Sequence, residues 1–221
     1  MRPIKRGKNS KIYTEYGQAK DDLKNEFGAY CSYCEMNTDN QVDIEHILPK
    51  EHYPTLITEW SNFLLACKAC NRQKWDKNIK KENYIFPDTD NTAYAYKYSQ
   101  TKVTVNQDLD DNEKILAQNT LDLVDINRKK DSKKRDDDRV TRSQEWNKAL
   151  DSLADYKECK TPQMLRQIGR SPSGFFSSWL EIFKEYPEIK KEILENVNGS
   201  AMECYDEDIN PIQSLVRKNE I

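Results

Sequence analysis

The stretch that decides the fold lies between positions 31 and 74 and consists of Cys31-Ser-Tyr-Cys34, Asp43-Ile-Glu45-His46-Ile-Leu-Pro49, Asn62-Phe-Leu-Leu-Ala-Cys67 and Lys68-Ala-Cys70-Asn71-Arg72-Gln-Lys74. Its most specific feature is a pair of Cys-x-x-Cys motifs, because each two-residue spacer lets two thiolates face one tetrahedral ion. Cys31, Cys34, Cys67 and Cys70 therefore predict a structural zinc site, in which four thiolates leave no position open for water or substrate. Cys159 and Cys204 lack this spacing, and we expect them to be lone buried thiols.

Short elements of regular structure are predicted between and after the two motifs. Apolar and polar residues alternate over 42–46, which is the period of a strand that ends before Pro49. A second short apolar strand is expected at 63–66, and a short helix at 71–77 begins from the second motif. The pattern predicts strand, loop, strand and helix around one metal ion.

The composition indicates a modest core and no membrane segment. Hydrophobic residues make up 36% of the 221 residues and charged residues 33%, so the helices should be well solvated. No apolar run approaches the roughly 18 residues of a membrane span, and no signal peptide is visible. We therefore expect no membrane contact and a cytoplasmic location, where thiols stay reduced and paired cysteines indicate metal rather than disulfides.

Charge is distributed unevenly, although the net charge is only −3. Lys and Arg gather in 1–11 and in 68–81, whereas the last forty residues are acidic. Local basic patches of this kind fit a polyanion that is held at one face, with a partner supplying further contacts. An ordinary solvated surface explains the same pattern, and charge alone does not separate the two interpretations.

The remainder of the chain predicts an α+β fold with a helical appendage. Helices are expected at 13–27, 110–124, 174–186 and 188–197, with a β-hairpin at 93–105. The charged segment 126–158 predicts one long exposed helix, or a helix with a disordered start near 129–138. We expect a core domain at 1–125 and an α-helical region at 126–221 that docks a partner.

His46 and its neighbours carry the candidate chemistry. A neutral imidazole can take a proton from water at cellular pH, and a divalent cation can neutralise charge that builds up on a phosphate. Glu45 and Asn71 offer the hard oxygen ligands that Mg²⁺ or Mn²⁺ prefers. The plain alternative is a hydrogen-bonded strand histidine beside a surface acid.

The order Glu45-His46-Ile-x-Pro49, Asn62 and Cys67-x-x-Cys70-Asn71-x-x-Lys74 resembles the HNH endonucleases. The resemblance implies a ββα-metal core in which His46 is the general base and Glu45 and Asn71 bind the catalytic ion. It also implies that Asn62 ties down the loop between the strands. The third motif residue is Asn rather than His, and the acid is Glu rather than Asp.

Segments along most of the chain resemble one HNH subfamily, the nuclease subunits of Septu-type anti-phage systems, which also occur beside retrons. They include Met1–Arg6, Tyr30–Glu35, Asn62–Cys67, Phe86–Thr92, Asn119–Asp125 and the aromatic block Phe175–Phe183. The resemblance implies a DNA-cleaving effector with an ATPase partner. An RNA substrate such as tRNA, or a zinc-ribbon adaptor without catalysis, remain the alternatives.

Several side chains around the motif are candidates for substrate contacts. Lys68, Arg72 and Lys74 flank the predicted metal helix and are expected to hold phosphates, and His52 is a further candidate in the loop. Solubility of an ordinary helix is the alternative for the three cations. Trp60 and Trp75 are expected in the core rather than against a base.

Overall fold

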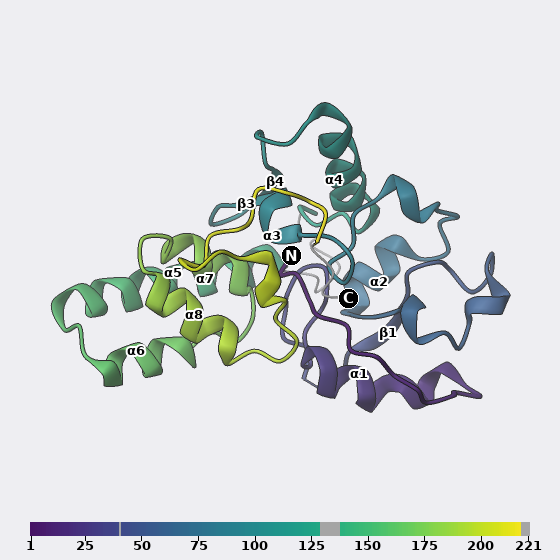
Figure 1. Ribbon diagram of the computed structural model, residues 1–221, viewed down its shortest axis with the longest axis horizontal. Coiled ribbons are helices and arrows are strands. Elements are labelled where there is room, and N and C mark those ends of the chain that lie inside the picture. The colour runs from purple at the N-terminus through teal and green to yellow at the C-terminus, as the bar shows by residue number, and fades with distance from the viewer. Residues whose placement is uncertain (40, 129–137, 218–221) are drawn as a thin grey trace.

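The computed structural model describes residues 1–39, 41–128 and 138–217, and the side chains of 138–140 are left aside. Figure 1 shows helices α5–α8 gathered on one side of the molecule and the elements β1, α1 and α2 on the other. The β3–β4 hairpin and α4 complete the molecule between and above them (Figure 1). None of the helices within these residues has the length and apolarity needed to cross a membrane.

The predicted strand–strand–helix unit is present. Strand β1 (Asp43–His46) pairs antiparallel with β2 (Phe63–Ala66), and His46 lies opposite Phe63 while Asp43 lies opposite Ala66. Helix α2 (Lys68–Lys74) follows directly, three residues earlier than the sequence pattern placed its start. The Cys67 sulfur explains the early start, because it accepts the N–H of Cys70 at 3.4 Å as the N-terminal cap.

The other elements of the first 128 residues surround this unit. Tyr16–Ala19 forms a 3₁₀ turn that leads into α1 (Lys20–Phe27), and the hairpin consists of β3 (Tyr96–Tyr98) and β4 (Val103–Val105). The hairpin is shorter than predicted, because its expected first residues form a single helical turn, α3 (Thr92–Ala95), capped by the Asn91 side chain. Helix α4 (Asp111–Leu123) matches its prediction and begins with a capping box between Asp110 and Glu113.

The C-terminal region is helical, as predicted. It contains α5 (Asp138–Glu158), α6 (Pro162–Gly169), α7 (Phe176–Ile182) and α8 (Pro187–Glu195). Helix α6 was not predicted because it is only eight residues long, although Thr161 as its cap and Pro162 as its first residue are signals present in the sequence. The expected disordered start near 129–138 lies almost wholly outside the described residues.

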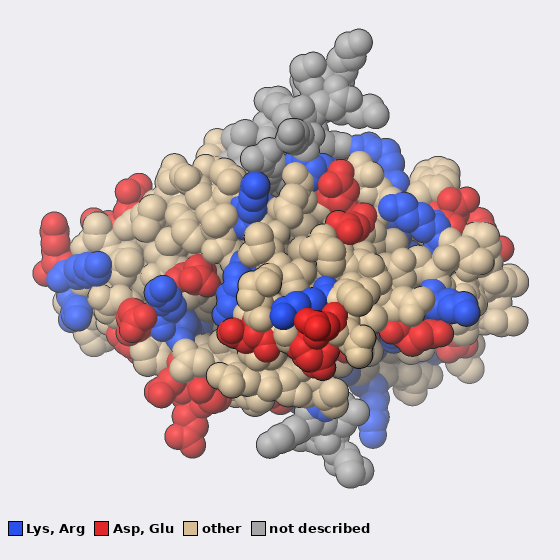
Figure 2. All heavy atoms as spheres, turned by 90° about the horizontal axis from the view of Figure 1, so that it is seen from above, with Lys and Arg blue, Asp and Glu red and all other residues tan. Residues whose placement is uncertain are grey.

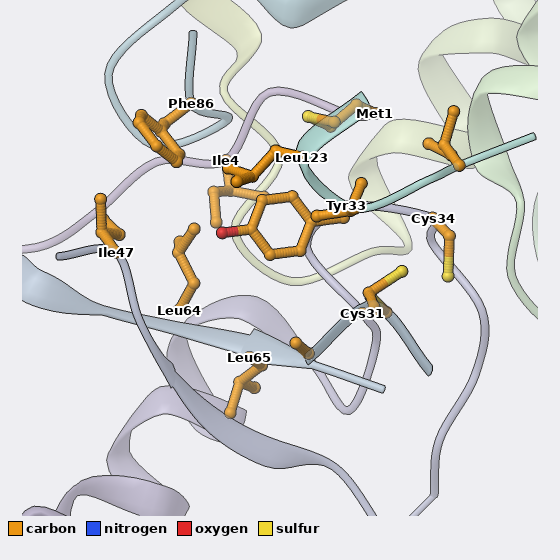
Figure 3. Packing of buried hydrophobic residues seen from close by; sticks show 14 of the residues in the cluster. Met1, Ile4, Cys31, Tyr33, Cys34, Ile47, Leu64, Leu65, Phe86 and Leu123 are labelled. Carbon is orange, nitrogen blue, oxygen red and sulfur yellow. The ribbon is translucent and has the colours of Figure 1, made fainter. Parts of the chain in front are cut away.

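One continuous core joins the N-terminal elements, and Tyr33 lies within it. Figure 3 shows the Tyr33 ring among Ile4, Leu64 and Leu123, with Cys31 and Cys34 beside it. Arg6, in the basic segment 1–11, is anchored to this part of the molecule, because its guanidinium bonds Asp88 and the carbonyl of Trp60. A second core under α5–α8 centres on Trp179, which is fully buried.

The helical region is attached to the first Cys-x-x-Cys motif through Glu35. The Glu35 carboxylate accepts the backbone N–H of Ser177 at 2.8 Å. The backbone carbonyl of Glu35 accepts the N–H of Phe175 at 3.0 Å. Gly174 permits this approach, since a Cβ at that position would lie 2.7 Å from the Glu35 carbonyl oxygen. The start of α7 is therefore fixed against the cysteine motif, and the division at residue 125 stays a prediction.

Candidate active site

The four cysteines of the two motifs come together as the sequence predicts. Their Sγ atoms lie within 4.8 Å of one another, all four residues are buried, and Cys34 Sγ is 3.8 Å from Cys67 Sγ. Four converging thiolates are the donor set of a structural zinc ion, and they leave no open coordination position. The arrangement thus fits zinc, and an ion there would hold α2 against the first motif.

His46 lies at the end of β1 with one ring nitrogen already engaged. Its Nε2 is 3.0 Å from the carbonyl oxygen of Ile57. Because a carbonyl oxygen can only accept, Nε2 must carry the proton, which leaves the Nδ1 lone pair available. Burial lowers the pKa of His46 below its ordinary value despite this bond, so the imidazole is neutral at cellular pH.

Asn62 ties together the loop that separates the two strands. Its Oδ1 accepts the N–H of Leu48 at 2.8 Å, and its Nδ2 donates to the carbonyls of Leu48 and Leu56 at 3.0 and 3.2 Å. These are the contacts of a loop anchor. They hold the segment that carries Ile57, and Ile57 in turn orients the His46 ring.

Glu45 forms a buried ion pair that the sequence did not predict. Its Oε1 lies 2.6 Å from Lys74 Nζ, and the exposed fractions of the residues are 2% and 0%. Burial raises the pKa of the Glu45 carboxyl to about 7, although Lys74 acts in the opposite direction. Lys74 also donates to the His46 carbonyl at 2.7 Å, so α2 is bonded to the end of β1.

Asn71 meets a carboxylate from β1, and that carboxylate belongs to Asp43. The Asn71 Nδ2 donates to Asp43 Oδ2 at 3.3 Å, which leaves the Asn71 Oδ1 free to face a cation. Asp43 was not predicted as a site residue, although its position two residues before Glu45 is a usable signal, because residues i and i+2 share a strand face. Asp43, Glu45, His46 and Asn71 all line one cleft of about 610 Å³.

Comparison with known proteins agrees with this geometry. Residues 31–77 match the family model described as HNH endonuclease. The chain carries an HNH endonuclease domain. HNH endonucleases are metal-dependent nucleases that hydrolyse phosphodiester bonds, and the family assignment made from the motif is confirmed.

One relative, a Septu protein, matches part of the chain. Septu protein PtuB of Bacillus thuringiensis is 43% identical over 63 residues, which covers 27% of this chain and 24% of the relative. The match therefore spans about a quarter of that relative's length. Part of this chain is therefore similar to a Septu-type protein.

The wall of the HNH cleft contains two of the four predicted substrate contacts. Lys68 and Arg72 line the cleft from α2, beside Asn71. His52 is exposed and bonds the Asp76 carbonyl at 2.9 Å, outside the cleft lining. Lys74 must be corrected, because its ammonium is buried against Glu45 and the His46 carbonyl and is not available to a phosphate.

Other residues of the cleft come from elements outside the motif. Tyr16, Lys20 and Lys50 line it opposite α2, and the Tyr16 and His46 ring centroids are 5.0 Å apart. Trp75 lines it as well with 70% of its surface exposed, so the prediction of a core position is wrong for Trp75. Trp60 packs against the core as predicted, whereas Cys159 is exposed rather than buried.

Two arginines beyond the HNH domain face the cysteine cluster. The terminal nitrogens of Arg128 lie 3.7 and 3.8 Å from Cys70 Sγ, and Arg142 on α5 has an exposed fraction of 1%. Burial lowers the pKa of Arg128, but the thiolates of Cys70, Cys34 and Cys67 outweigh it, so the pKa is raised. Four thiolates around one divalent ion would carry excess negative charge, and the Arg128 guanidinium, in contact with Cys70 Sγ, is placed to compensate it.

Proposed function

We propose that this protein is a metal-dependent endonuclease that hydrolyses the phosphodiester bonds of DNA. We further propose that it is the effector subunit of a cytoplasmic anti-phage complex with an ATPase partner. The observation that carries the proposal is the imidazole of His46, neutral and with Nδ1 available, in one cleft with Asp43, Glu45 and Asn71. A zinc adaptor without catalysis has no use for such a histidine.

The chemical roles follow from the positions of these side chains. His46 Nδ1 takes a proton from a water molecule whose oxygen attacks phosphorus, and the bond from phosphorus to the leaving oxygen breaks. The Ile57 carbonyl keeps the ring oriented throughout and stabilises the imidazolium that results, since Nε2 donates to it. Lys68 and Arg72 hold the phosphates on either side of the scissile linkage.

Oxygen atoms of Glu45 and Asn71 are the proposed ligands of the catalytic ion, with Asp43 beside them. Their donor set is hard and anionic, which suits Mg²⁺ or Mn²⁺, and Glu45 Oε1 is buried with no hydrogen bond besides its ion pair to Lys74. When bound, such an ion supplies positive charge that stabilises the phosphate in the transition state. Lys74 keeps Glu45 in place for this role.

The mixed charge of the surface fits the proposal of a partner, and the similarity to a Septu protein supports a defence complex. Lys, Arg, Asp and Glu are interspersed on the face shown in Figure 2, with no field of one sign. A surface of this kind holds a polyanion weakly. We therefore expect the isolated chain to cut weakly, and the ATPase subunit to supply further contacts to the nucleic acid.

The test is a cleavage assay on the zinc-loaded chain, alone and together with the ATPase subunit that we propose as its partner. Plasmid DNA, total RNA and tRNA are offered with Mg²⁺ or Mn²⁺, so that the preferred nucleic acid emerges from the same experiment. We expect DNA cleavage, and a loss of about 10²- to 10⁴-fold in His46→Ala. His52→Ala serves as the control, since that ring lies outside the cleft. Undiminished cutting by His46→Ala would refute the mechanism.

A further inference from the structure

We propose that Trp75 is the platform on which a base of the substrate stacks, and that the HNH cleft therefore takes a strand that is unpaired beside the scissile linkage. The proposal rests on the nuclease function above and specifies its substrate class. It applies to DNA and RNA alike, because the face of a base is common to both.

The indole of Trp75 is largely exposed to solvent, so it gains little from packing against the protein. Its exposed fraction is 70%, whereas Trp179 is fully buried and Trp60 packs against the core. Burial of an indole would stabilise the fold, and this position forgoes that stabilisation. A structural role therefore does not explain the side chain.

The backbone of Trp75 also adopts a conformation that favours glycine. Its φ is 47° and its ψ is −131°, values of the second residue in a type II′ turn, where glycine predominates. The N–H of Lys77 donates to the Lys74 carbonyl at 3.2 Å and closes this turn. A tryptophan here costs folding free energy, and strained residues of this kind concentrate at ligand sites.

The strained turn places the ring close to the reacting groups. The N–H of Trp75 donates to the carbonyl of Asn71 at 2.8 Å, so the ring is one helical turn from the proposed metal ligand. Trp75 lines the same cleft as His46, and Lys68 and Arg72 lie along the same helix. A nucleotide whose phosphate is held by these cations has its base within reach of the indole.

The charges of the cleft explain why a stacking contact is needed. Four cationic residues (Lys20, Lys50, Lys68 and Arg72) line it together with four acids (Asp43, Glu45, Glu51 and Asp76). Attraction of the side chains for a polyanion is thus largely cancelled. Stacking of a base on an aromatic ring does not depend on charge and supplies affinity that the cations do not.

Stacking at this position selects the conformation of the substrate. Within a duplex both faces of each base are covered by its neighbours, so an indole on the protein surface finds no free face. A single strand, a loop or a frayed end exposes base faces, and such segments bind proteins by stacking on aromatic side chains. We therefore infer that unpaired segments of DNA or RNA are bound in preference to a regular duplex.

The experiment measures binding rather than cleavage. Fluorescein-labelled oligothymidylate, oligouridylate and a duplex of equal length are titrated by anisotropy into the zinc-loaded full chain carrying His46→Ala, so that no probe is cut. Trp75→Gly, Trp75→Phe and Ile115→Ala are compared in this background. Ile115 is the matched control, because it is 58% exposed and does not line the cleft.

We expect Trp75→Gly to weaken single-strand binding by about 5- to 150-fold, which corresponds to about 1–3 kcal/mol of stacking at 1.4 kcal/mol per tenfold change. Duplex binding should change little, Trp75→Phe should recover most of the loss, and Ile115→Ala should have no effect. The melting temperature of Trp75→Gly should stay the same or rise, because the strained turn is relieved. If Trp75 instead stabilised the fold, Trp75→Gly would have a lower melting temperature than the parent.

Several outcomes would overturn the inference. They are a wild-type cleft that binds no single strand, unchanged single-strand affinity in Trp75→Gly, and equal losses for single strand and duplex. Loss of the ATPase from co-purification with single-strand affinity intact would assign Trp75 to a protein contact instead. Failure of the nuclease proposal would be seen separately, as the absence of cleavage by the wild-type chain in the cleavage assay.

Discussion

Lys74 Nζ lies 2.6 Å from Glu45 Oε1, and neither side chain is exposed by more than 3%. Removal of one member of a buried ion pair leaves the other charge without compensation. At pH 8, above the pKa of about 7 of the Glu45 carboxyl, Lys74→Met should lower the free energy of unfolding by about 3–5 kcal/mol. The double variant Glu45→Gln with Lys74→Met should recover much of this loss in urea denaturation, and a double variant as unstable as the single one would show that the pair is not coupled.

The same pair predicts how stability depends on pH. The pKa of the Glu45 carboxyl is raised from 4.5 to about 7 by burial, so the folded state binds the proton more tightly than the unfolded state. This contribution to stability is present below pH 4.5 and is lost as pH rises through about 7. Between pH 6 and pH 8, without added Mg²⁺ or Mn²⁺, the wild type should lose stability relative to Glu45→Gln; parallel curves would contradict this.

The zinc centre should control which thiols react with iodoacetamide. Cys159 is exposed and should be alkylated in the native protein, whereas burial raises the pKa of Cys204 to about 11 and should protect it. Chelation of zinc should release Cys31, Cys34, Cys67 and Cys70 for reaction and unfold the core, since structural zinc contributes roughly 10–16 kcal/mol in small peptides. Mass spectrometry counts the modified sites, and early labelling of the four motif cysteines with zinc bound would argue against the centre.

Arg128 should strengthen the binding of zinc, because its guanidinium lies against the Cys70 sulfur. Arg128→Ala should weaken zinc binding by about 10- to 100-fold, which is the usual effect of an outer partner of a metal ligand. Competition with a chromogenic chelator measures this. Arg170→Ala provides the control at an exposed arginine, and equal zinc affinity in both variants would count against the role of Arg128.

Asp43 should matter for the catalytic ion, since it fixes the amide of Asn71. Asp43→Ala should reduce Mn²⁺ affinity by about 10- to 100-fold with little change in melting temperature. Calorimetric titration of the zinc-loaded protein with Mn²⁺ tests this. Asp151→Ala on α5 is a suitable comparison, because that residue is solvent-exposed and does not line the cleft.

The motif spacing predicted the ββα unit and the zinc cluster because both depend on local chemistry. Two Cys-x-x-Cys turns can close around one ion in few ways. Pro49 lies just beyond the end of the first strand, and Cys67 lies between the second strand and the helix. The hairpin and α4 were predicted in the same manner, from alternation and from apolar residues at helical spacing respectively. Helix α6 was not predicted, because its eight residues are too few to show a clear helical period.

Contacts between distant segments were not predictable. Lysine is usually a surface residue, and only the position of α2 against β1 shows that Lys74 is buried in an ion pair with Glu45. Arg142 lies in a strongly charged segment that favours solvent, yet it is buried near the cysteines. Trp75 was expected in the core because large aromatic residues usually are, and the turn after α2 exposes it instead.

The bond between Glu35 and the first residues of α7 bears on how such nucleases can diversify. Enzymes can gain new specificity when a catalytic domain is recombined with a different accessory region. Here the C-terminal helical region supplies Ser177 and Phe175 as partners for the turn that carries Cys31 and Cys34, so an unrelated region would leave that turn unsupported. The HNH domain and the helical region are therefore expected to be inherited together, with new partners recruited through changes on the outer faces of the helices.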